Sequence, residues 1–179
     1  MLQGRVRAYE WGSLRAIPEL FGKEAAEGPV AEVWLGAHPD DPASVGRVHS
    51  IFDESQLYPS RVAPRAAGPS LDEWVAQDPD LILGESVVER YGARLPYLLK
   101  LIAPAQPLSL QVHPSIAQAE EGYAAEEAAG VPHRDPRRNY KDRNHKPELV
   151  YALSTFQALA GFRARRRIGE VIEALGTPL

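Results

Sequence analysis

The sequence contains no cysteine and only one methionine among its 179 residues. The lack of cysteine excludes disulfide-linked scaffolds, zinc fingers, iron–sulfur centres and thiol nucleophiles, so any bound metal must be held by histidine, carboxylate or amide groups. No apolar run approaches the roughly 20 residues that span a bilayer, and the first residues carry no hydrophobic signal segment. We therefore expect a cytoplasmic protein that does not use a membrane.

An excess of positive charge is also missing, because 20 Lys and Arg residues stand against 24 Asp and Glu residues, a net charge of −4. Affinity for nucleic acid comes mainly from Lys and Arg side chains that displace phosphate counterions, so we expect no nucleic-acid partner. The hydrophobic content of 44% is typical of a globular chain that buries a core. The 16 prolines and 14 glycines divide the chain into short pieces, which predicts a strand-rich protein with many loops.

Periodicity and capping signals predict the individual elements. Strands are expected at residues 30–37, 97–103, 108–113, 148–153 and 155–162, and the strand at 97–103 is expected to be buried on both faces. Helices are expected at residues 70–77 and 115–129, each with a Ser and a Glu or Gln three residues later as a capping box, and the second ends at Gly130. A third, amphipathic helix is expected from the spacing of Ile168, Val171, Ile172 and Leu175, with Gly176 as its cap.

The segment 108–113 alternates strictly between apolar and polar residues. Its polar residues Ser109, Gln111 and His113 would share one face, because successive side chains of a strand point to opposite sides. The α-carbons of Gln111 and His113 would then be roughly 6.6–7 Å apart, and both side chains could reach one ion. A half-exposed strand of an antiparallel sheet explains the same pattern without any ligand, so both interpretations stay open.

The segment 144–148 (NHKPE) is the second candidate site. Pro147 restricts the backbone of Lys146, so Glu148 would begin the next strand with little freedom and could join Gln111 and His113 on a metal. An ordinary charged loop that leads into a strand is the alternative.

Two further features involve positive charge. Lys100 interrupts an apolar run, so its ammonium must pair with a carboxylate, extend into water or face a cavity that receives an anion. The loop 131–146 carries six basic residues against two acidic ones, beginning with Arg134. On composition alone it could be a solvated loop that balances the acidic helix at 120–127.

Five blocks together resemble type I phosphomannose isomerases in order and approximate spacing: residues 9–12 (YEWG), 31–39 (AEVWLGAHP), 98–100 (LLK), 108–114 (LSLQVHP) and 142–148 (DRNHKPE). The similarity runs through essentially the whole chain and corresponds to the N-terminal part, somewhat under half, of a usual family member. The resemblance implies a mainly β fold with helices: the N-terminal part of a cupin-like (RmlC-like) jelly roll over residues 1–162 and the beginning of a helical domain over 163–179.

The resemblance also implies roles for individual residues. Gln111, His113 and Glu148 match the family's ligands of one Zn²⁺, and Lys146 is a candidate for proton transfer. Lys100, Ser109, Glu32 and Trp34 match polar or cleft positions and are candidates for binding substrate. The basic loop 131–146 would provide a favourable field for the phosphate that the resemblance implies. The family's fourth ligand, a histidine, and an active-site arginine have no counterpart in this chain.

The activity implied is the interconversion of mannose 6-phosphate and fructose 6-phosphate through an enediol, with a small sugar phosphate as the partner. Such a reaction needs a cation beside the carbonyl, and a site with one carboxylate ligand keeps a net charge of about +1 on zinc. A non-catalytic cupin-type fragment or binding module is the alternative, because the fourth ligand and the arginine are absent. A cupin metal oxygenase fits less well, because its iron triad needs a second histidine where Gln111 stands. The sequence does not indicate an oligomeric state.

Overall fold

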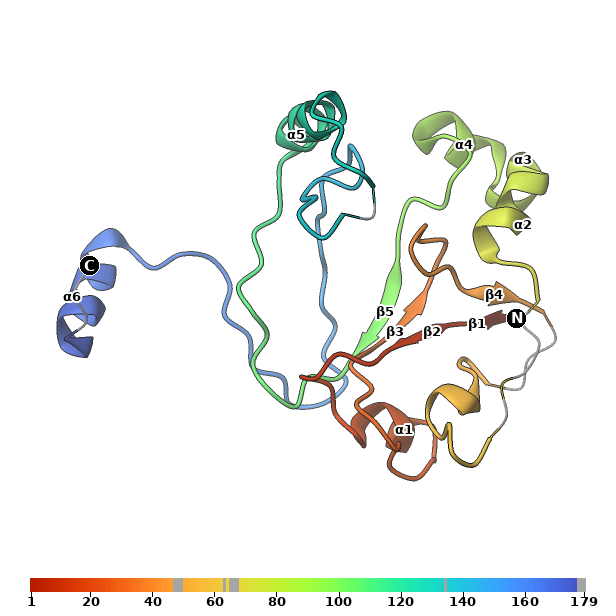
Figure 1. Cartoon of the computed structure of the whole chain (residues 1–179), viewed down its shortest axis with the longest axis horizontal. Helices are drawn as coiled ribbons and strands as arrows, with labels where there is room; N and C mark the ends of the chain where they lie inside the picture. The colour runs from red at the N-terminus through yellow and green to blue at the C-terminus, as the bar shows by residue number, and fades with distance from the viewer. Residues whose placement is uncertain (47–49, 63, 65–67, 134, 177–179) are drawn as a thin grey trace. The chain divides into compact units, whose positions relative to one another are not determined.

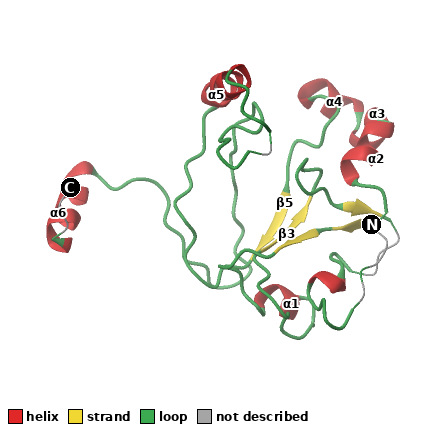
Figure 2. Cartoon of the chain, viewed as in Figure 1, coloured by secondary structure: helices red, strands yellow, loops and turns green. Residues whose placement is uncertain are grey.

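In the computed structural model, the residues described are 1–46, 50–62, 64, 68–133 and 135–176. They form two compact units, Met1–Leu110 and Gln111–Leu179. The strands lie in the first unit, whereas the helices are divided between the two (Figures 1 and 2). In chain order the elements are β1 (Leu2–Gln3), β2 (Arg5–Arg7), α1 (Ala16–Leu20), β3 (Glu32–Leu35), β4 (Ser44–Val45), the 3-10 helix η1 (Glu54–Gln56), α2 (Leu71–Gln77), α3 (Pro79–Leu83), α4 (Glu85–Tyr91), β5 (Leu99–Ile102), α5 (Ile116–Ala128) and α6 (Arg165–Leu175).

A three-stranded antiparallel sheet in the order β2-β3-β5 organises the first unit (Figure 1). The central strand β3 pairs Trp34 with Arg5 on one side and with Lys100 on the other. Val33 belongs to the opposite face, because side chains alternate along a strand, and it is completely buried. The sheet therefore has one apolar face and one face that carries charged and aromatic side chains.

The apolar face of the sheet packs against the hydrophobic core of the first unit. The buried core residues are Ile17, Ala26, Val30, Val33, Phe52, Leu57, Tyr58 and Ala103. Val6, Leu35 and Leu101 of the three strands pack against this cluster. Burial of these side chains fixes which face of each strand is turned inward, and with it the face on which Glu32, Trp34 and Lys100 lie.

The helices predicted from capping signals are present. Helix α2 begins after Ser70 with the expected capping box. Helix α5 begins after Ser115, whose side chain accepts a hydrogen bond from the backbone of Gln118, and Gly130 follows its C-terminal end with φ +67°. Helix α6 ends at Gly176 in the left-handed conformation, as predicted.

The strands predicted at 108–113 and across 148–162 are not formed; both segments lack regular secondary structure. A strand needs a neighbour to receive its backbone hydrogen bonds, and no described strand pairs with either segment. Leu110 and Val112 are accordingly 83% and 74% exposed. The prediction that residues 97–103 are buried on both faces is also wrong, because β5 forms a sheet edge and Leu99 is 55% exposed.

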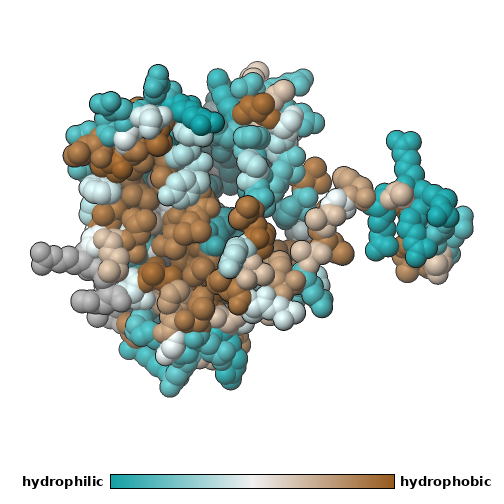
Figure 3. All heavy atoms as spheres, turned by 180° about the vertical axis from the view of Figure 1, so that it is seen from behind, coloured by the Kyte–Doolittle hydropathy of each residue, from teal (hydrophilic) through white to brown (hydrophobic). Residues whose placement is uncertain are grey.

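Many apolar side chains remain at the surface (Figure 3). The most exposed in the second unit are Leu149, Tyr151, Leu159 and Phe162. The structure thus combines sheets with helices, and its described strands close no barrel. None of the described helices is long and apolar enough to cross a membrane. The predicted division at residue 162 stays a prediction.

Candidate metal and substrate site

Three of the predicted substrate-binding residues lie together on the polar face of the β2-β3-β5 sheet. Trp34 Nε1 donates a hydrogen bond of 2.6 Å to Glu32 Oε2, and both residues are buried. Lys100 Nζ lies 3.7 Å from the same carboxylate oxygen and 4.7 Å from the centre of the Trp34 ring system. Of the alternatives for Lys100, pairing with a carboxylate is confirmed, and the Trp34 ring adds a cation–π contact.

The same sheet face carries a second cation that the sequence did not single out. The guanidinium of Arg7 lies 4.7 Å from the Trp34 ring, and its Nη1 donates a hydrogen bond of 2.7 Å to Asp41. Burial is the largest single effect and lowers the pKa of Arg7, but the interactions with Asp41 and Tyr9 together outweigh it, so the pKa of Arg7 is raised. The alternation of Arg5, Val6 and Arg7 is the sequence signal that could have identified this short strand and its polar face.

Two of the predicted metal ligands lie together in the second unit. His113 Nδ1 is 3.9 Å from Glu148 Oε2, although 35 positions separate the two residues in the sequence. Lys146 Nζ lies 3.6 Å from Oε1 of the same carboxylate. Glu148 is therefore the common neighbour of His113 and Lys146, with its own side chain 50% exposed.

His113 also provides the observation that tests whether these residues suit a metal. Its Nε2 is buried and has no hydrogen-bond partner within the described part of the chain. A buried polar nitrogen without a partner costs free energy, and a bound cation would satisfy it. An imidazole nitrogen and a carboxylate oxygen are also ligands that zinc accepts, so the residues fit the ion.

The remaining predicted ligand, Gln111, is exposed and lies two positions before His113 in the same irregular segment. Among the described residues, no cluster of three or more His, Cys, Asp or Glu side chains could hold a metal. A site built on Gln111, His113 and Glu148 is compatible with this result, because one of its three ligands is an amide.

The predicted site residues fall into two groups. Glu32, Trp34, Lys100 and Ser109 belong to the first unit, with Ser109 exposed in the irregular segment after β5. Gln111, His113, Lys146 and Glu148 belong to the second unit.

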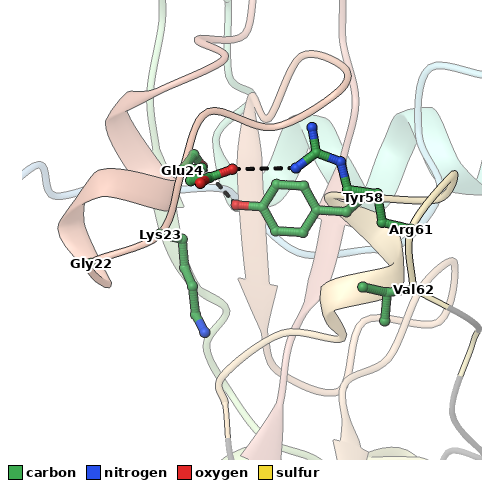
Figure 4. Close-up of a pocket in the computed structure, with 6 residues that line it drawn as sticks. All are labelled: Gly22, Lys23, Glu24, Tyr58, Arg61 and Val62. Atoms are coloured by element: carbon green, nitrogen blue, oxygen red, sulfur yellow. Dashed lines mark hydrogen bonds and ion pairs between the residues drawn. The ribbon is translucent and has the colours of Figure 1, made fainter.

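A separate pocket of about 240 Å³ lies in the first unit, lined by Gly22, Lys23, Glu24, Tyr58, Arg61 and Val62 (Figure 4). Lys23 Nζ pairs with Glu54 at 2.7 Å, and Arg61 Nη1 pairs with Glu24 at 3.2 Å. The Tyr58 hydroxyl donates a hydrogen bond of 2.6 Å to the backbone oxygen of Glu24. Because both cations of the pocket are already paired with carboxylates, the pocket does not present a free charge to a ligand.

Residues 1–165 match the family described as phosphomannose isomerase type I, catalytic domain. The chain is 43% identical over 171 residues to mannose-6-phosphate isomerase from Escherichia coli (strain K12), which covers 94% of this chain and 39% of that protein. It is 35% identical over 179 residues to mannose-6-phosphate isomerase 2 from Arabidopsis thaliana, covering 93% of this chain and 35% of the relative. The chain thus spans less than half the length of these relatives.

Solved structures of mannose 6-phosphate isomerases are also similar to this chain. One is mannose 6-phosphate isomerase from Salmonella typhimurium bound to its substrate, fructose 6-phosphate, and to zinc, with a TM-score of 0.64 and 38% identity. The match covers 81% of this chain and 32% of that one. Another is a zinc-bound mannose 6-phosphate isomerase with a TM-score of 0.62, also 38% identical. Together with the family match over nearly all of its length, these similarities show that the chain belongs to the type I phosphomannose isomerase family.

Proposed function

We propose that this chain supplies the first part of a zinc-dependent aldose–ketose isomerase that interconverts mannose 6-phosphate and fructose 6-phosphate. The observation that carries the proposal is the buried, unpartnered Nε2 of His113, in a side chain that lies beside Glu148. The zinc-bound relatives support the choice of metal. The proposal also covers the fold, in which the described strands belong to a cupin-like jelly roll. It further places the protein in the cytoplasm.

Gln111, His113 and Glu148 are the residues proposed to hold the ion. With one carboxylate, one imidazole and one neutral amide as ligands, the site would keep a net positive charge of about +1. When bound, the zinc supplies Lewis acidity that polarises the substrate carbonyl. The absence of thiolate ligands suits this role, because thiolates would neutralise the charge.

The chemical change removes a proton from the carbon beside the carbonyl, passes through an enediol and returns the proton to the neighbouring carbon. We assign Lys146 to this region because its ammonium lies 3.6 Å from Glu148. There it can donate a hydrogen bond to a substrate oxygen or move a proton at that oxygen. The side chain of Lys146 is 54% exposed, so a substrate can reach it.

Lys100 and Ser109 are proposed to bind the phosphate through charge-assisted hydrogen bonds. Glu32 and Trp34 would then hold Lys100 in place, the first by its carboxylate at 3.7 Å and the second by its ring at 4.7 Å. An ammonium fixed in this way loses less side-chain entropy when it binds an anion.

Turnover by the complete gene product tests the proposal. The protein should convert mannose 6-phosphate, lose activity when zinc is removed by a chelator and regain it when zinc is returned. The double variant Gln111→Ala/His113→Ala should lack both the metal and the activity. Activity that survives chelation and the double substitution would overturn the proposal.

A metal-binding module without turnover is the second candidate, favoured by the absence of any histidine after Glu148 in this sequence. The 179-residue chain, purified by itself, distinguishes the two. Zinc binding without conversion of mannose 6-phosphate would support the module for this chain, and conversion would exclude it.

A further inference from the structure

One carboxylate on helix α5 holds the backbone of the loop that leads to Glu148. Glu126 Oε1 accepts a hydrogen bond of 2.9 Å from the backbone N–H of Asn139, and Oε2 accepts one of 2.8 Å from the N–H of Tyr140. The Glu126 side chain is only 16% exposed. Both oxygens of one side chain are therefore committed to two successive residues of the loop.

Arg138 ties the same loop together from within. Its side chain is 1% exposed, its Nη1 donates 2.7 Å to the backbone oxygen of Val131, and its Nε donates 2.9 Å to that of Tyr140. Nη2 lies 2.6 Å from Glu127, and the guanidinium stacks 4.9 Å from the Tyr123 ring. Arg138 thus joins both ends of the 131–140 segment to helix α5, and it does not act as a solvated loop charge. Arg134, the first basic residue of the loop, lies outside the described residues.

Aromatic contacts extend this attachment toward Glu148. The Tyr140 ring packs against the backbone of Gly122, where a Cβ would lie 2.5 Å from ring atoms Cδ2 and Cζ. The guanidinium of Arg143 lies 5.1 Å from the Tyr123 ring on the same helix. The preceding residue, Asp142, accepts a hydrogen bond of 2.7 Å from the backbone of Asn144. A continuous set of contacts therefore runs from α5 to within four residues of Glu148.

Glu148 itself has little to fix its orientation. It is half exposed, and its charged neighbours, His113 at 3.9 Å and Lys146 at 3.6 Å, lie beyond hydrogen-bond distance. A metal ligand needs supporting contacts that set its position, and the loss of such support typically lowers metal affinity. The part of this loop that has such supporting contacts is the part attached to α5.

We propose that Glu126 and Arg138 are positioning residues for Glu148 and Lys146. They attach the preceding part of the loop to α5 and so set where Lys146 and Glu148 lie. The inference rests on the proposed function, because it concerns the same metal and the same substrate. Neither residue contacts the reacting atoms in this assignment. Glu126 is the better residue to test, because glutamine has the same shape but has one acceptor oxygen in place of two. It can therefore keep the hydrogen bond from only one of the two backbone N–H groups in the present geometry.

The test measures zinc affinity of the complete gene product in the wild type, Glu126→Gln and Glu121→Gln. Glu121 is an exposed residue of the same helix, so its substitution makes the same change in charge without touching the loop. We expect zinc affinity to fall about 10- to 100-fold in Glu126→Gln and to stay unchanged in Glu121→Gln. Cobalt in place of zinc should show an altered visible absorption spectrum in Glu126→Gln alone, a signature that a purely structural role would not change.

Activity adds a second readout. At saturating zinc, Glu126→Gln should lower kcat more than it raises KM, because the phosphate-binding residues of the first unit are not altered. If Glu126→Gln does not fold, Gly122→Ala decides the question, because alanine favours the helix while its methyl group displaces Tyr140. Reduced zinc affinity in Gly122→Ala, with α5 fully helical, would then support the inference.

A folded Glu126→Gln protein with the zinc affinity and the cobalt spectrum of the wild type would overturn the inference and leave the proposed function intact. If Glu126→Gln does not fold, the same result in Gly122→Ala would overturn the inference. A wild-type protein that binds no zinc would overturn the proposed function, and the inference with it. The two failures are therefore distinct.

Discussion

Trp34 and Lys100 are register partners across β3 and β5, and the ammonium of Lys100 lies 4.7 Å from the Trp34 ring. The pairing places Lys100 next to Glu32, which precedes Trp34 by two positions and therefore shares its strand face. A cation, an aromatic ring and a buried carboxylate thus form one cluster that the sheet register assembles.

This cluster predicts a cost for removing the cation. Lys100→Met would remove the cation beside the buried carboxylate of Glu32 and leave that carboxylate with the hydrogen bond from Trp34 among its described contacts. We therefore expect the free energy of unfolding to fall by about 1–3 kcal/mol. The double variant Lys100→Met/Glu32→Gln should lose less than Lys100→Met alone, because the neutral amide needs no counterion. Urea unfolding of the variants measures both effects.

Lys23 provides the matched control for this prediction. It also pairs with a glutamate, but Lys23 and Glu54 are 37% and 39% exposed. Lys23→Met should therefore cost much less than Lys100→Met. If Lys100→Met lowers the free energy of unfolding no more than Lys23→Met does, the Lys100–Glu32 pair does not stabilise the sheet. The same conclusion follows if the effects of Lys100→Met and Glu32→Gln are fully additive in the double variant.

The capping box of α5 leads to a second prediction. Ser115 accepts from the backbone of Gln118, while the Gln118 side chain accepts a 2.9 Å hydrogen bond from the backbone of Ser115. Ser115→Ala should destabilise the first turn by about 1 kcal/mol, which corresponds to a roughly fivefold loss of amide protection in that turn. Gln118→Ala should have a similar effect, and the double variant should lose less than the sum, because both residues belong to one interaction.

Hydrogen exchange of the α5 amides measures this prediction locally. Ser70→Ala is the control, since it removes an equivalent capping box from α2 in the first unit. That substitution should leave the protection of α5 unchanged. Equal loss of α5 protection in Ser70→Ala would show that the effect is not local to the cap.

The attachment of the loop to α5 predicts a dependence on pH. Hydrogen bonds from the backbone of Asn139 and Tyr140 lower the pKa of Glu126 from its ordinary value of 4.5, against the opposing effect of burial. Because the pKa is lower in the folded protein than in the unfolded chain, the stabilisation is complete above about pH 4.5 and is lost as the pH falls below that value. Asp135, whose pKa the side chain of Arg137 lowers, adds a change of the same sign.

The protection of the Asn139 and Tyr140 amides, followed from pH 6 to pH 3, checks this prediction. Protection should be constant down to about pH 4.5 and fall below it, and the fall should be smaller in Glu126→Gln. Protection that is independent of pH in the wild type would contradict the assignment of Glu126 as the acceptor of both hydrogen bonds.

The sequence predicts those elements whose signals are local. The capping boxes at Ser70 and Ser115 lie within four residues, so helices α2 and α5 are predicted nearly to their ends. Strand β3 is predicted as well, because its β-branched and aromatic residues are concentrated in one short run. The segment 108–113 has an equally clear strand pattern, but a pattern does not supply the neighbouring strand that backbone hydrogen bonds require.

Prediction of the candidate site shows the same division. The family blocks name His113 and Glu148, and the structure places their side chains together. The contacts of Glu126 with Asn139 and Tyr140 connect residues 13 and 14 positions apart, and no periodic pattern reports such a pairing. Opposite charges on Glu126 and Arg138 were visible in the sequence only as an acidic helix followed by a basic loop.

Zinc binding by the complete gene product tests the central claim most directly. One zinc ion should bind per chain to the wild type and to His133→Ala, a control that removes another histidine from the second unit. His133 is exposed and is not a proposed ligand. His113→Ala should lose the zinc or bind it at least about tenfold more weakly, because the imidazole ligand is removed and only Gln111 and Glu148 of the three proposed ligands remain. Zinc bound to His113→Ala with wild-type stoichiometry and affinity would contradict the account.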